Sequence, residues 1–163
     1  HSTCGGQTEA AQDVWGNHVD YLQSVPCNYC ASSPHYKPTQ VVLSSKQVSD
    51  SVSKLGISVP ASKIPQTGVI AVSSLSPTGR VKQVLVDGKT VRGLEFRSAL
   101  NLKSTKFTWS VQGDNIVFQV AGYGHGVGLC QYGADGAARA GMNYLEILAY
   151  YYPGTQVAHI FEE

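Results

Sequence analysis

The sequence predicts an α+β fold, with a mainly antiparallel sheet, short helices and Gly-rich loops. Its middle third is rich in β-branched residues, and these segments are separated by turn signals such as Asp87-Gly88, a favourable two-residue hairpin loop. Apolar residues alternate at Phe107, Trp109 and Val111, which indicates a strand with one buried face. The expected strands are 69–75, 80–86, 89–92, 106–111 and 116–121.

Short helices are expected on both sides of this region, and most of residues 1–40 are expected to be loop. Apolar residues lie three and four apart at 45–55, and Gly56 follows as a stop signal. Thr8 is expected to cap a single helical turn that ends near Trp15. Further helices are expected at 94–100, 131–140 and 144–152, and a last strand at 156–161.

Composition limits both the class of protein and its ligands. An apolar fraction of 42% in 163 residues suffices for the core of one domain, 1–163. A net charge of +1 without a basic run argues against nucleic acid as a partner, whereas a charged fraction of only 14% suits neutral, hydroxyl-rich ligands such as carbohydrate. No apolar run approaches the roughly 20 residues of a membrane-spanning helix. Because the chain starts without Met or a signal peptide, we expect a mature chain or a fragment.

The cysteines suggest a metal site. Cys27 and Cys30 form a CxxC pair, and Cys4 follows His1 in an HxxC pair. Two such turns each point two ligands at one ion, which is how tetrahedral zinc sites are usually built. The spacing therefore predicts a structural zinc site of Cys4, Cys27 and Cys30, with Cys130 or His1 as the fourth ligand. Disulfides in an oxidising compartment, or free thiols, are the alternatives.

A second candidate site is the segment 122–128, in which four glycines surround His125. Glycines leave the backbone open to a bulky ligand and leave the imidazole free, although a lone His in a turn is often structural. The spacing does not match the GxGxxG or Walker patterns, so a nucleotide loop is not expected. Gly5 and Gly6, followed by polar side chains, form a similar but weaker signal.

These residues also carry a family resemblance. The run GYGHGVGLCQYGADGAARAG, followed by YLEILAYYYPGT, resembles the C-terminal signature of the stage II sporulation protein D family, which includes the amidase-enhancer proteins. The segments HSTCGGQTEAAQDVW, YLQSVPC and LEFRSALNLKSTKF resemble internal blocks of that family, in the same order. The resemblance implies the C-terminal part of a larger catalytic domain that acts outside the cytoplasm, in the periplasm, in the cell wall or anchored to the outer face of the membrane.

The activity implied by the resemblance is that of a peptidoglycan lytic transglycosylase. Such enzymes cleave the β-1,4 bond between N-acetylmuramic acid and N-acetylglucosamine without water and leave a 1,6-anhydro end. The implied partners are glycan strands and other cell-wall hydrolases. The resemblance implies that His125 acts in catalysis and that a set of motif residues lines the glycan cleft. These motif residues are His1, Ser2, Gly6, Thr8, Gln131 and Tyr132.

The chain departs from the family pattern in two ways. The family's catalytic Glu lies in an N-terminal half, upstream of the block that begins at His1. Cys130 stands where many relatives carry Ser, which favours Cys130 over His1 as the fourth metal ligand. Because the acid is missing, two alternatives remain: a non-catalytic peptidoglycan-binding or amidase-enhancer module, and a zinc domain that binds another protein.

The reaction needs a carboxylic acid of raised pKa, and the chain offers four carboxylates near its motifs. Glu9 and Asp13 are expected to stabilise a helix N-terminus, while Glu95 and Asp135 are expected to be solvated. None of the four is favoured as the acid catalyst.

Overall fold

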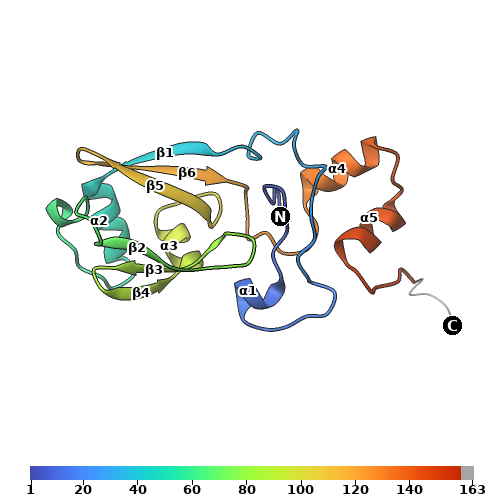
Figure 1. The fold of residues 1–163 in the computed structure, drawn as a ribbon, viewed down its shortest axis with the longest axis horizontal. Coiled ribbons are helices and arrows are strands. Elements are labelled where there is room, and N and C mark those ends of the chain that lie inside the picture. Colours follow the sequence, from blue (N-terminus) through green and yellow to red (C-terminus); the bar gives the residue numbers. More distant parts are fainter. Residues whose placement is uncertain (159–163) are drawn as a thin grey trace.

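The computed structural model describes residues 1–158 and confirms the α+β class, but the strands form two sheets where the sequence suggested one (Figure 1). Each sheet has three antiparallel strands, in the orders β1-β6-β5 and β2-β3-β4. The strands are β1 (Thr39–Ser44), β2 (Ile70–Leu75), β3 (Val81–Val86), β4 (Lys89–Arg92), β5 (Lys106–Gln112) and β6 (Asn115–Ala121).

The hairpin predicted at Asp87-Gly88 is present, because its turn is encoded locally. Val86 pairs with Lys89 across a turn in which Asp87 has φ 49°, a conformation that Asp tolerates better than most residues. The unpredicted strand is β1, which pairs with β6 along its whole length, from Thr39 opposite Val120 to Ser44 opposite Asn115. Such long-range pairing leaves no local sign in the sequence.

The predicted helices are present with small shifts of their ends. They are α1 (Ala11–Trp15), α2 (Ser45–Ser53), α3 (Gly93–Ala99), α4 (Gln131–Arg139) and α5 (Tyr144–Tyr151), with one 3-10 turn at Ala61–Lys63. The Ser44 side chain caps α2 by accepting from the Gln47 amide, and Asn143 caps α5 in the same way. None of the described helices has the length and apolar character that crossing a membrane requires.

Two of the local predictions are wrong. Thr8 does not cap α1, whose N-cap is Ala10 without a side-chain hydrogen bond, because the Thr8 hydroxyl instead accepts from the Val25 amide. Residues 156–158 form no strand, and the rest of the predicted last strand lies outside the described residues.

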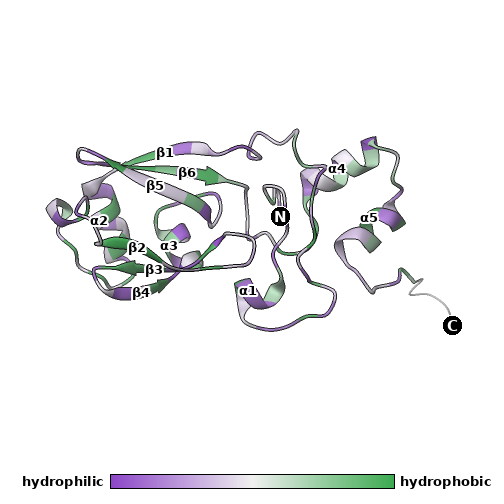
Figure 2. Cartoon of the chain, in the orientation of Figure 1, coloured by the Kyte–Doolittle hydropathy of each residue, from purple (hydrophilic) through white to green (hydrophobic). Residues whose placement is uncertain are grey.

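The buried residues form two separate clusters. The first, which we call the sheet core, joins both sheets with α2 and α3 and includes Val84, Phe96 and Phe118. The second, which we call the cysteine cluster, joins the four cysteines to Ala137 of α4 and to Ile147 and Tyr151 of α5. In Figure 2 strands β2, β3 and β6 are largely hydrophobic, whereas α4 and α5 mix hydrophobic and hydrophilic residues.

The N-terminal segment connects these two clusters. Residues 1–10 run beside the Gly-rich loop 122–130, with an antiparallel bridge between Thr3 and Tyr123 and a parallel bridge between Glu9 and Val127. On the other side Gln7 pairs with Pro26. The two Gly-rich segments that the sequence analysis singled out therefore lie next to each other.

Candidate functional site

The structure brings the four cysteines together as one buried group. Their Sγ atoms all lie within 4.8 Å of one another, and those of Cys4 and Cys30 are 3.5 Å apart. All four side chains are fully buried and all four thiols are free. The predicted ligand set of Cys4, Cys27, Cys30 and Cys130 is therefore assembled in space, while His1 lies outside it.

The donor set suits a tetrahedral metal ion. A zinc ion with four thiolates at about 2.3 Å places the sulfurs about 3.8 Å apart, which is close to the arrangement seen. The Cys4 amide donates to the Cys130 Sγ at 3.4 Å, and the Tyr151 hydroxyl lies 3.1 Å from the Cys27 Sγ. Such contacts orient thiolates and stabilise their negative charge.

Glycine in α4 makes this packing possible. A Cβ at Gly133 would lie 2.0 Å from the Tyr151 hydroxyl and 2.6 Å from the Cys27 Sγ. Any side chain there would push α4 away from the sulfurs. The helix therefore carries Gly133 at some cost to helix stability, in exchange for close approach.

The sulfurs also share their protons unequally. Hydrogen bonds from Cys27, Cys30 and Cys4 lower the pKa of the Cys130 thiol, while the hydrogen bond with Cys130 raises the pKa of the Cys4 thiol. Four buried thiols that share hydrogen bonds form a soft donor set, which favours binding of a soft cation.

His125 lies beside His1, with 5.6 Å between ring centroids, and beside Trp15, at 5.4 Å. The Val127 amide donates to His125 Nδ1 at 3.1 Å, so the neutral ring carries its proton on Nε2. Burial lowers the pKa of His125, and the nearby cations Arg97 and Arg80 lower it further. The site thus presents a neutral imidazole whose Nε2–H can donate to a ligand.

The glycines around His125 are required by close neighbours and by backbone conformation. Gly124 has φ 109°, and a Cβ there would lie 2.9 Å from the His1 Cβ. Gly126 has φ 88°, and a Cβ there would lie 2.9 Å from the Arg80 guanidinium carbon. A side chain at either position would collide with His1 or Arg80. The two glycines therefore let the loop pack closely against both residues, and this packing fixes the position of His125.

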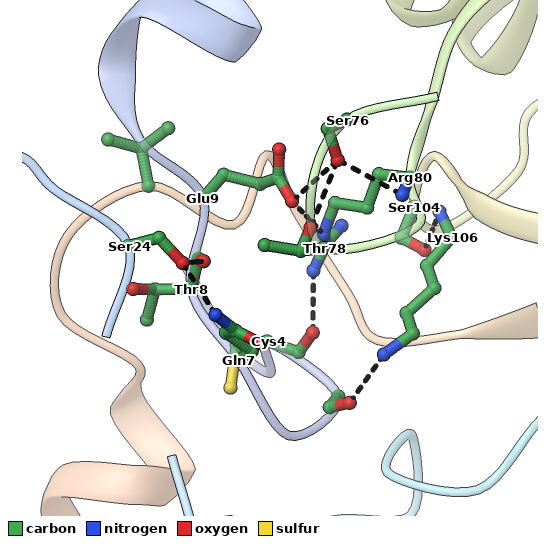
Figure 3. Close-up of polar contacts among 12 residues, drawn as sticks. Cys4, Gln7, Thr8, Glu9, Ser24, Ser76, Thr78, Arg80, Ser104 and Lys106 are labelled. Atoms are coloured by element: carbon green, nitrogen blue, oxygen red, sulfur yellow. Dashed lines mark hydrogen bonds and ion pairs between the residues drawn. The ribbon is translucent and has the colours of Figure 1, made fainter. Parts of the chain in front are cut away.

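A buried polar network stabilises the base of this loop (Figure 3). Arg80 is 2% exposed and Glu9 1%, and Arg80 Nε lies 3.6 Å from Glu9 Oε1. Ser76 donates to the same oxygen at 3.1 Å, and Arg80 Nη2 donates to the Cys4 carbonyl at 2.6 Å. Arg80 therefore joins the second sheet to the cysteine turn and the His125 loop at once.

The carboxylates occupy settings that differ from one another. Burial raises the pKa of Glu9, although Arg80 opposes the shift. The expectation that Glu9 stabilises a helix end is wrong, because it precedes the cap of α1 and pairs with Arg80 instead. Asp13 does lie in the first turn of α1, and Asp135 is exposed and pairs with Arg139. Glu95 is exposed too and accepts from the Arg92 amide at the start of α3.

The other predicted substrate-binding residues fall into two groups. Ser2, Gln131 and Tyr132 lie with His1, because the Gln131 and Tyr132 amides donate to the His1 and Ser2 carbonyls. Gly6 and Thr8 lie on the opposite side of the N-terminal segment. The Gly6 carbonyl accepts from the Cys27 amide, and the buried Thr8 hydroxyl contacts the Val25 backbone. Their roles in substrate binding stay predictions.

Two residues of the site were not singled out by the sequence analysis. Trp15 ends the segment HSTCGGQTEAAQDVW, and nothing in the local pattern distinguishes it from a core residue. Arg80 appeared only as the first residue of an expected strand. A Trp at the last residue of a short helix, directly before Gly16, is a signal that could have drawn attention to Trp15. Arg80 becomes visible only when segments more than 70 residues apart are packed together.

Comparison with known proteins identifies relatives. Stage II sporulation protein D of Bacillus subtilis (strain 168) is 35% identical over 157 residues, and the protein of the same name from Bacillus amyloliquefaciens is 32% identical over 157 residues. Each match covers 96% of this chain. The Amidase enhancer of Bacillus subtilis (strain 168) is 37% identical over 83 residues, which are 49% of this chain and 12% of that protein. No protein-family model matches.

These matches confirm the resemblance: over nearly its whole length, the chain is homologous to bacterial proteins named Stage II sporulation protein D. The chain spans 43% of the length of both of these relatives. It therefore corresponds to less than half of such a protein.

Proposed function

We propose that this chain is part of a peptidoglycan lytic transglycosylase and that it binds the glycan strand at His125. The proposal is supported by the homologues named Stage II sporulation protein D and by the sequence motifs around His1 and His125. It places the protein outside the cytoplasm, where peptidoglycan lies. Fractionation of native cells, with the protein traced by antibody, tests that location.

The observation that carries the proposal is the neutral, glycine-flanked His125 beside Trp15. Its Nε2–H is a donor suited to a sugar oxygen, and an aromatic face next to it suits the C–H face of a pyranose. Low overall charge fits a ligand of neutral sugars. We assign His125 to donating a hydrogen bond to the glycan near the bond that breaks.

The reaction assigns the remaining roles. A carboxylic acid gives its proton to the glycosidic oxygen as the C1–O bond breaks, and the muramyl 6-hydroxyl oxygen then bonds to C1. The 6-hydroxyl proton returns to the carboxylate, so one carboxyl group serves as acid and then base. We expect that group upstream of His1. Glu9 has a raised pKa, but Ser76 and Arg80 occupy its carboxylate, so we assign it to holding the loops together.

The experiment uses the full-length protein and glycan strands stripped of stem peptides. We expect 1,6-anhydromuramyl products by mass spectrometry and a loss of rate of about 100-fold in His125→Ala. His18→Ala is the matched control, because His18 is an exposed histidine that pairs with Asp20. A folded wild-type protein that yields no anhydro product would contradict the proposed activity.

The second candidate is a glycan-binding or amidase-stimulating module without its own turnover. It is supported by the relative named Amidase enhancer, and by the fact that no carboxylate is among the described hydrogen-bond partners of His125. Calorimetry with glycan strands separates the two, since binding without product favours the module. A cell-wall amidase added to the same sample would then work faster if the module stimulates it.

We also propose that Cys4, Cys27, Cys30 and Cys130 hold a structural zinc ion. The support is the group of four buried sulfurs, which all lie within 4.8 Å of one another, and the Cys4 amide that donates to the Cys130 Sγ. With four protein ligands the ion has no open position, so it contributes fold stability rather than chemistry. Bound metal would also protect these thiols from oxidation outside the cytoplasm.

A further inference from the structure

The largest pocket described lies beside the His125 site rather than in it. It has a volume of about 560 Å³, which is within the range of pockets that hold small organic ligands. Helix α1 and the residues around it form one wall, and the ends of β2 and β3 form the other. Glu9 and Arg80 lie at its base and Trp15 at its edge.

Unpartnered polar atoms are concentrated in the wall of this pocket. Among the described residues, four buried side-chain atoms have no hydrogen-bond partner: Arg80 Nε, Arg80 Nη1, Gln12 Oε1 and His1 Nε2. The first three belong to residues that line the pocket. Leaving such groups unpaired is costly, so they indicate that the pocket holds a polar ligand.

The charges of the pocket favour a neutral ligand. Glu9 is paired with Arg80, and Asp13 with Lys82 at 2.9 Å, so these four charges cancel. The fifth charged residue of the lining, Arg92, is exposed, and its guanidinium donates to the Val14 carbonyl at 3.4 Å. A carboxylate placed against Arg80 would also face the Glu9 carboxylate. A hydroxyl or acetamido group avoids this repulsion, because it accepts from the Arg80 N–H groups and donates to the Gln12 Oε1.

The shape of the rim favours a sugar ring. Trp15 is 48% exposed, lines the pocket and lies 5.4 Å from the His125 ring. A half-exposed aromatic residue is common on protein surfaces, but this one lies between a polar pocket and a histidine. Its face offers the C–H side of a pyranose a flat apolar surface, while the polar pocket accepts the ring's equatorial groups.

We infer that this pocket is a subsite for one neutral N-acetylhexosamine ring of the glycan, stacked on Trp15 and hydrogen-bonded by Arg80 and Gln12. The inference rests on the proposed function, because the glycan strand that passes His125 supplies the ring. It extends the glycan site by one sugar, from His125 across Trp15 to the second sheet.

The test is calorimetry of the full-length protein with chitotetraose, a tetramer of N-acetylglucosamine. We expect Trp15→Ala to weaken binding about tenfold or more, and Gln12→Leu to weaken it about threefold, each with unchanged melting. Tyr21→Ala is the matched control, since Tyr21 is also 48% exposed and does not line the pocket. Its affinity should equal that of the wild type.

Different failures lead to different conclusions. If chitotetraose binds, His125→Ala weakens it, and both Trp15→Ala and Gln12→Leu bind like the wild type, the subsite is refuted and the proposed function survives. If no glycan binds the folded wild type, the proposed function fails and the subsite fails with it. The neutral-ring assignment would be overturned if Trp15→Ala weakened the binding only of muramyl oligosaccharides that carry free carboxylates.

Discussion

The sheet core and the cysteine cluster are stabilised by different physical means. The sheet core buries eighteen apolar residues against two antiparallel sheets. The cysteine cluster buries seven residues, four of which are cysteines, and its helix α4 carries Gly133 and Gly136. Apolar burial alone can hold the first region together, whereas the second depends on what its sulfurs bind. The proposed glycan site lies where the two regions meet.

The largest expected effect comes from breaking the cysteine cluster. Cys27→Ser should abolish zinc binding, and the binding free energy of a structural zinc, about 10–16 kcal/mol, is comparable to the whole stability of a domain. Hydrogen exchange should then show loss of protection in α4 and α5 while β3 and β6 stay protected. Metal analysis by mass spectrometry gives the stoichiometry.

Ser32→Ala is the control for that substitution, because Ser32 is exposed and follows the CxxC turn directly. It should leave both zinc content and melting unchanged. A Cys27→Ser protein that melts like the wild type would refute the zinc proposal.

The next largest effect comes from opening the sheet core. Phe96 is fully buried and stacks with Phe107 at 5.9 Å, so Phe96→Ala should cost about 3–5 kcal/mol in the free energy of unfolding. Zinc content should not change, because the cavity lies away from the sulfurs. Val72→Ala on the exposed side of β2 is the control and should change stability little. If Phe96→Ala also released zinc, the two regions would not be independent.

A smaller effect is expected at the buried ion pair that joins the regions. Arg80→Met or Glu9→Gln alone leaves one buried group without its partner and should cost about 3 kcal/mol in the free energy of unfolding. The double variant should cost less than the sum of the two.

The same pair predicts a pH dependence. Because burial raises the folded-state pKa of Glu9, the contribution of Glu9 to stability falls as pH rises through that pKa. Glu9→Gln should remove this dependence of stability on pH. Denaturant unfolding across pH 4–8 measures the stability loss of each variant and its dependence on pH. If the stability losses of the two single variants were strictly additive in the double variant, the pairing would be contradicted.

The smallest effect concerns His125 itself. Burial lowers its pKa below the ordinary value of about 6.5, so an NMR titration should place the His125 midpoint below that value. The stability contributed by neutral His125 is complete above the unfolded pKa and is lost as pH falls through the lowered folded pKa. We expect less than about 1 kcal/mol. A His125 midpoint at or above about 6.5 would show that the imidazole is not held neutral.

Local pattern was enough to predict much of the fold. The hairpin at Asp87-Gly88 and the helix ended by Gly56 were predictable because their signals lie within a few residues. Strand β1 and the division into two sheets were not, because they depend on pairing between residues 39–44 and 115–120, far apart in the sequence. Local propensity says nothing about such partners.

The site divides in the same way. The CxxC pair was visible from spacing, and the choice of Cys130 came from a family resemblance rather than from geometry. Trp15 and Arg80 were beyond reach, because their roles come from contacts with residues more than 70 positions away. Glu9 shows the opposite problem: its position near a helix start predicted a cap, but tertiary packing placed it in a buried pair instead.

The most direct test of the proposed glycan site is a crystal structure of the full-length protein with chitotetraose bound. We predict one sugar ring stacked on Trp15, with its polar groups toward Arg80 and Gln12. The next ring should lie within hydrogen-bond reach of His125 Nε2. Sugar bound elsewhere, with Trp15 and His125 untouched, would contradict it.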